Sequence, residues 1–175
     1  TARFDRAFQA TGTWHDDRLD PGSREASGGT GGFSHGGRPV AGKGAGGYVE
    51  FAPGDGPVNV KVGISYVSRE AAEANLAAEN PPGRSFDAVR EAARRAWRER
   101  LGAIRVGGGT DAERTTFYTA LYHALLHPNV ISDADGRYRG ADGRVHRVDR
   151  HRHAQYGTFS GWDVYRDQVQ LLTLL

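Results

Sequence analysis

An indole, a carboxylate and a guanidinium lie within five positions of one another in residues 159–166, which read FSGWDVYR. A carboxylate such as that of Asp163 accepts hydrogen bonds from two neighbouring pyranose hydroxyls, and the ring of Trp162 offers a flat apolar wall to the C–H face of a sugar. On a helix, Asp163 and Arg166 would stand at i and i+3, so the guanidinium would hold the carboxylate in one rotamer. The pattern indicates a sugar-binding site; the alternative is a surface salt bridge beside a core Trp.

Two further patterns precede this segment in the sequence. Residues 115–127 have an aromatic-rich helical pattern that Pro128 ends, and residues 133–143 contain two Asp-Gly pairs that predict the turns of a short hairpin. In this order and spacing, the three patterns resemble glycoside hydrolase family 92, the calcium-dependent exo-acting α-mannosidases. The resemblance continues upstream through residues 60–68, 71–79 and 86–97, roughly the last two thirds of the chain.

The resemblance implies a fold of two domains. Residues 1–67 would be the C-terminal part of a β-sandwich, residues 68–109 a helical linker, and residues 110–175 the incomplete start of an (α/α)6 catalytic toroid. The change from a period of two before residue 68 to a helical period after residue 84 independently favours two domains over one alternating sheet.

The resemblance also implies residue roles and a mechanism. Asp163 would bind hydroxyls of the mannose in the minus-one subsite, with Trp162 shaping the pocket and Arg166 supporting it. Single-step inversion needs an acid and a base about 6.5–9.5 Å apart. In the family these are a Glu and an Asp which, like most of the calcium ligands, are expected outside this chain, so we expect the 175 residues alone to be inactive. Val164 and the residues 168–170 depart from the family pattern without touching the polar site residues.

Composition excludes several functional classes. The chain has no Cys, which excludes disulfides, thiolate catalysis and Cys-based zinc sites. Its net charge of +2 does not indicate a nucleic-acid partner, and no apolar run is long enough to span a membrane. The absence of Met and the apolar last residues predict an internal fragment. The resemblance implies a secreted or cell-surface bacterial enzyme, with a mannose-containing glycan and the rest of its own catalytic domain as partners.

Alternating apolar residues predict strands in the first part of the chain. One or two strands are expected in residues 4–14, one in 48–51, and the longest in 58–67. In that longest strand the even-numbered apolar side chains should lie on a core and the odd-numbered side should lie in water. The glycine-rich residues 28–47 are expected to form a long loop or hairpin tip.

Capping residues and a helical period predict four helices. Their expected ranges are 69–79 after Ser68, 84–101 around the cap Ser85, 111–127 after the capping box of Thr110, and one helix from Gly161 to the end of the chain. The third helix is apolar on most of its circumference, which predicts that it is buried nearly all round. His123 on that helix is therefore expected to make a core hydrogen bond.

Three other motifs favour a structural interpretation. Residues 37–44 come within one residue of a phosphate-binding loop, but they lack the preceding strand and following helix that such a loop requires. The carboxylates of Asp133, Asp135 and Asp142 do not have calcium-loop spacing and are interpreted as turn residues. The histidines 146, 151 and 153 lie among arginines that would repel a metal ion, which indicates loop surface.

Two other functions remain open from the sequence. One is a non-catalytic carbohydrate-binding or scaffold segment, which would equally lack an acid and base pair. The other is an (α/α)6 glycosidase of different specificity, with glucose-type substrates, since Trp-Asp motifs recur in such toroids.

Overall fold

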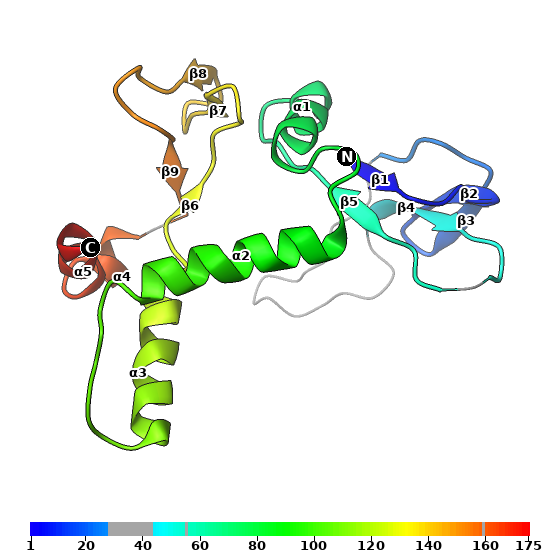
Figure 1. Cartoon of the computed structure of the whole chain (residues 1–175). Coiled ribbons are helices and arrows are strands. Elements are labelled where there is room, and N and C mark those ends of the chain that lie inside the picture. The colour runs from blue at the N-terminus through cyan, green and yellow to red at the C-terminus, as the bar shows by residue number, and fades with distance from the viewer. Residues whose placement is uncertain (28–43, 55, 159) are drawn as a thin grey trace. The chain divides into compact units, whose positions relative to one another are not determined.

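A computed structural model describes residues 1–27, 44–54, 56–158 and 160–175 (Figure 1). The chain divides into two compact units, one of Thr1–Ala2 with Lys61–Leu175 and one of Arg3–Val60. The boundary passes through the short strands β1 (Ala2–Phe4) and β5 (Val60–Val62). The division predicted at residues 67 and 109 stays a prediction. No helix in the described ranges is long and apolar enough to cross a membrane.

The smaller unit is built on a three-stranded antiparallel sheet. Its central strand β2 (Ala10–His15) pairs with β3 (Arg18–Pro21) on one side and β4 (Ala45–Glu50) on the other. Each of the two aromatic side chains on β2 and β4 lies across a glycine of the opposite strand: the ring of Trp14 covers Gly46, where an added Cβ would come within 2.6 Å of the indole, and Tyr48 covers Gly12. The predicted strands in 4–14 and 48–51 are confirmed in outline.

The predicted glycine-rich loop was wrong over its last three residues. Ala45, Gly46 and Gly47 belong to β4, because the sheet needs a residue without a side chain beneath the Trp14 ring. Residues 28–43, which carry the rest of that loop and most of the phosphate-loop pattern, lie outside the described residues.

The strand predicted at 58–67 is reduced to the three residues of β5, and the assignment of its faces was inverted. Val62 and Ile64, expected in a core, are 62% and 71% exposed. Gly63, expected in water, is buried against the first helix, where a Cβ would lie 2.8 Å from the Leu76 Cβ. The absence of a side chain at residue 63 lets the backbone approach the helix, so that side of the strand becomes the packed one.

Three capped helices follow, and the predicted capping residue of each is confirmed. These are α1 (Arg69–Glu79), α2 (Phe86–Leu101) and α3 (Asp111–Ala124). Ser68 Oγ and Ser85 Oγ accept the hydrogen bonds of the N3 backbone N–H groups at 3.1 and 3.2 Å, and Thr110 and Glu113 form the reciprocal capping box. These starts depend on residues three positions apart, which makes them readable from sequence.

The third helix is shorter and less buried than predicted. It ends at Ala124 rather than His127, and within the described chain only its Leu121 is buried, whereas His123 is exposed with its ring beside that of Tyr122. The prediction of a nearly fully buried helix and of a core hydrogen bond for His123 was therefore wrong for the described residues. The contact between Trp97 and Tyr122, with ring centroids 4.5 Å apart, joins α2 to α3.

Two small antiparallel pairs and two short helices complete the larger unit. Strand β6 (Asn129–Val130) pairs with β9 (Tyr156–Gly157), and β7 (Arg137–Arg139) pairs with β8 (Val145–Arg147), which confirms the predicted hairpin. The single helix predicted from Gly161 is broken into α4 (Gly161–Val164) and α5 (Gln168–Leu174). The side-chain amide of Gln170 donates to the carbonyl of Tyr165 at 2.9 Å. In a continuous helix that carbonyl would accept from a backbone N–H four residues later.

Candidate functional site

The candidate sugar-binding residues lie in residues 160–166, which we call the Trp-Asp segment. Its Trp162 lies in α4 and is 84% exposed. Arg166 lies past the end of α4, where its guanidinium stacks on the Tyr165 ring at 5.2 Å and its Nε donates to the Tyr165 hydroxyl at 2.6 Å. The backbone of Asp163 belongs to α4, and its side chain is outside the described part of the chain. The predicted pairing of Asp163 with Arg166 therefore stays a prediction.

The exposure of Trp162 defines what the Trp-Asp segment can do. An indole that is largely in water is available to stack on the C–H face of a sugar, and covering it would remove its apolar surface from solvent. Tyr165 adds a second planar surface two positions after Asp163, and Arg166, stacked on Tyr165, adds a cation three positions after Asp163. The segment thus offers binding groups for a neutral polyhydroxylated ring.

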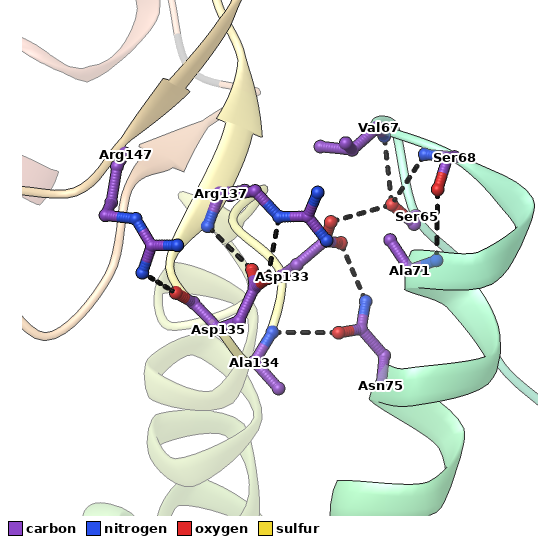
Figure 2. A network of polar contacts seen from close by, with 10 residues as sticks. All are labelled: Ser65, Val67, Ser68, Ala71, Asn75, Asp133, Ala134, Asp135, Arg137 and Arg147. Carbon is purple, nitrogen blue, oxygen red and sulfur yellow. Dashed lines mark hydrogen bonds and ion pairs between the residues drawn. The ribbon is translucent and has the colours of Figure 1, made fainter.

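A buried polar cluster of the larger unit lies elsewhere, around the carboxylate of Asp133, which is 6% exposed (Figure 2). Its Oδ2 accepts from Ser65 Oγ at 2.9 Å and its Oδ1 accepts from Asn75 Nδ2 at 2.7 Å. The Asn75 amide also donates to Ile64 O at 2.9 Å and accepts from Ala134 N–H at 2.8 Å. We call Ser65, Asn75, Asp133 and Ala134 the Asp133 network. It joins α1, the segment before it and the base of the β7–β8 hairpin.

The Asp133 network corrects the interpretation of Asp133 as a turn residue. The backbone of Asp133 does form the turn, accepting from Gly136 N–H at 2.8 Å, but its carboxylate points to α1. Neither Ser65 nor Asn75 was predicted from the sequence as a partner of Asp133. The signal was present: Asn75 stands among Ala71, Ala72 and Leu76 on the buried stripe of α1, where a polar residue needs a partner.

The other two acidic residues of this region do behave as turn residues. Asp135 accepts from the backbone N–H of Arg137 at 3.0 Å and from its Nε at 2.6 Å, and these bonds lower the pKa of its carboxyl. Asp142 accepts from His146 Nε2 at 3.0 Å across the hairpin, which lowers the pKa of Asp142 in the same way. His151 and His153 are exposed, as expected for loop surface.

The carboxyls whose pKa values are shifted are poor proton donors at neutral pH. In the described ranges each such carboxyl has its pKa moved downward by hydrogen bonds: Asp5, Glu70, Glu113, Asp135 and Asp142. A general acid of a glycosidase needs a raised pKa so that it holds its proton at working pH. These five groups are therefore suited to accepting hydrogen bonds and not to protonating a leaving group.

A calcium site does not fit the described residues of this chain. They contain no group of three or more His, Asp or Glu side chains that could hold a metal ion. The partners of Asp133 are an amide and a hydroxyl. Those of Asp135 are the guanidinium and backbone N–H of Arg137, and those of Asp142 are the imidazole of His146 and the backbone N–H of Arg144, so the carboxylate oxygens are already occupied by donors.

Comparison with known proteins identifies the family. The catalytic-domain model of glycosyl hydrolase family 92 matches residues 71–175. The chain belongs to glycosyl hydrolase family 92. An uncharacterized secreted glycosidase of Arthroderma benhamiae is 37% identical to this family 92 chain over 90 residues, which are 48% of the chain and 12% of that protein.

Solved structures of family 92 enzymes have the same fold over nearly the whole chain. A family GH92 inverting mannosidase of Bacteroides thetaiotaomicron is 25% identical, with a TM-score of 0.78 over 98% of this chain and 21% of that one. A GH92 α-mannosidase of the same organism, at 23% identity and a TM-score of 0.71 over 98% of this chain and 22% of that one, shares the fold. The family 92 glycosyl hydrolase ccman5 is 27% identical, with a TM-score of 0.64 over 92% and 20%.

The chain therefore spans about a fifth of the length of these solved family 92 proteins and 12% of the curated relative. The recognition made from the sequence is confirmed, and the structure fits part of a family 92 enzyme. The finer division into sandwich, linker and toroid remains an expectation from the resemblance.

Proposed function

We propose that this chain is part of a glycoside hydrolase that removes terminal α-linked mannose from glycans with inversion of configuration. The observation that supports the proposal best is the likeness over 98% of the chain to an enzyme described as an inverting family GH92 mannosidase. The description of the Arthroderma benhamiae relative as a secreted glycosidase supports a secreted or cell-surface location. The calcium dependence expected from the resemblance is assigned to the longer enzyme.

In this proposal the Trp-Asp segment contributes binding and orientation. Trp162 covers the C–H face of the mannose, Asp163 accepts hydrogen bonds from two of its hydroxyls, and Arg166 supports the site. The acid and the base that invert the anomeric centre are contributed by residues beyond this chain. The 175 residues alone are expected to hydrolyse no α-mannoside above background.

The replacement Asp163→Asn in the longer protein tests this assignment. Asparagine keeps the volume but replaces a charged acceptor, so hydrogen bonds worth about 1.5–3 kcal/mol each should weaken. We expect kcat/KM for an aryl α-mannoside to fall by orders of magnitude while the thermal midpoint barely moves. The exposed Asp149, replaced by Asn, is the matched control and should keep parental kinetics.

The competing assignments predict different results. If Asp163 is only half of a surface pair with Arg166, the variant should lose no more than about 1 kcal/mol of stability and keep its kcat/KM. If the longer protein is a non-catalytic carbohydrate-binding protein, it should bind mannose without turnover. Turnover of α-glucosides in preference to α-mannosides would favour another specificity on the same fold.

A further inference from the structure

The C-terminal end of α3 has carbonyl groups that its own backbone cannot satisfy. The last four carbonyls of any helix lack a partner in the ladder unless the chain continues. In a continued helix, the carbonyl of Ala124 would accept from the N–H of residue 128, but residue 128 is Pro and has no N–H. The carbonyl of Ala124 is therefore left for a side chain, another segment or water to satisfy.

Gln168, the first residue of α5, supplies a donor to that carbonyl from 44 positions further along the chain. Its Nε2 donates to Ala124 O at 2.6 Å and to His127 O at 2.8 Å, so both N–H groups of one amide are used on the same helix end. The neighbouring carbonyl of Leu126 accepts from Asn129 Nδ2 at 3.2 Å. Two side-chain amides thus complete the end of α3.

Asn129 also attaches the chain immediately before the Trp-Asp segment. Its backbone N–H donates to Thr158 Oγ1 at 3.2 Å, and Thr158 Oγ1 lies 2.6 Å from Asn129 Oδ1, which makes a reciprocal pair. Thr158 has a φ of +58°, in the left-handed region that a β-branched residue rarely adopts. Backbone held in such a conformation is maintained only where the surroundings determine it and is concentrated at binding sites.

The two attachments lie on either side of the Trp-Asp segment and reach the same place. Thr158 precedes the segment by two positions and is bonded to Asn129 at the start of β6, and Gln168 follows it by two and is bonded to Ala124 at the end of α3 and to His127, so both attachments lie within residues 124–129. We propose that Gln168, together with the Asn129–Thr158 pair, positions the Trp-Asp segment for sugar binding by fixing one of its ends to the C-terminus of α3 and the other to β6. This inference rests on the proposed function of the segment and adds the residues that make its geometry reproducible.

A positioning role and a purely structural role predict different measurements. If Gln168 only completes a helix end, its loss should lower the thermal midpoint and leave the sugar site unchanged below that midpoint. If it positions the segment, the loss should appear in mannose affinity and in kcat/KM at a temperature where the variant is folded, because a displacement of about 1 Å in a binding group can cost up to about 100-fold.

The test uses the longer protein with Gln168→Met, which keeps side-chain length but removes both donors. We expect kcat/KM for an aryl α-mannoside and the affinity for methyl α-mannoside, measured by calorimetry at 25 °C, each to fall at least about tenfold. Gln9→Met is the matched control: it removes the same amide from an exposed Gln in the smaller unit, away from the Trp-Asp segment. It should stay within about twofold of the parental protein in both measurements.

Thr158 provides a second and independent pair of variants. Thr158→Val keeps the branched shape without the hydroxyl and should lower kcat/KM and mannoside affinity as Gln168→Met does. Thr158→Ser keeps the hydroxyl and should keep the parental affinity. A folded Gln168→Met or Thr158→Val protein with parental kinetics would overturn the inference while leaving the proposed function intact. A parental protein that neither binds nor hydrolyses an α-mannoside would overturn both.

Discussion

The Asp133 network and the Trp-Asp segment place polar chemistry in opposite environments. In the network a carboxylate that is 6% exposed is held by an amide and a hydroxyl, and in the segment an indole is 84% exposed. Groups that meet a sugar must be reachable from water, so they cannot contribute much to the core. Groups that hold a fold together must be buried and fully hydrogen-bonded. The residues whose types indicate sugar binding are therefore not the residues that hold the fold together.

The largest effect on stability is expected from breaking the network. Asp133→Ala leaves the hydroxyl of Ser65 and one amide N–H of Asn75 without their acceptor in a buried place, which should cost about 2–4 kcal/mol in the free energy of unfolding. Urea unfolding of the full chain measures this. The exposed Asp149, which accepts from the N–H of His151 in its own turn, is the control. Equal stability of the Asp133→Ala and Asp149→Ala proteins would remove the distinction between the two environments.

A smaller effect separates the two tryptophans of the larger unit. Trp97 packs on Tyr122 between α2 and α3, so Trp97→Ala should cost about 2 kcal/mol. Trp162→Ala should change stability by less than about 0.5 kcal/mol, since its side chain is already in water. Thermal unfolding of both variants makes the comparison. A Trp162 variant as destabilised as the Trp97 variant would show that Trp162 packs in the folded chain.

The smallest effect is a local pH dependence in the β7–β8 hairpin. The hydrogen bond from His146 lowers the pKa of Asp142 in the folded hairpin relative to the unfolded chain. Its stabilisation is therefore present above the ordinary range of an Asp carboxyl and is lost as the pH falls through the lower, folded-state value. Amide hydrogen exchange of residues 137–147 should show this loss below about pH 4. Asp142→Asn should weaken that pH dependence and leave the part due to the Asp135–Arg137 bonds, and an unchanged exchange profile in the variant would contradict the assignment.

The family, the starts of three helices and the hairpin were readable from residues close together in the sequence. A capping side chain and the backbone N–H that donates to it are three positions apart, and the turns of the hairpin use Gly136 and Gly143 at φ of +84° and +75°. Such features depend on local backbone geometry, which residue types determine directly. The Trp-Asp segment was recognisable for a related reason, because its residue types stand at a short spacing.

Tertiary structure decided which surfaces are buried. Residues 58–67 do alternate, but their apolar side was wrongly predicted to face a core. Gly63 lets α1 pack on the opposite side instead. The buried role of Asp133 depends on Asn75, 58 positions away, and the end of α3 depends on Gln168, 41 and 44 positions from the carbonyls it binds. Local spacing contains no information on such partners, since a buried polar group is stabilised by whichever donor the fold brings to it. The sequence by itself determined the family and the local elements, and only the tertiary structure determined what holds them together.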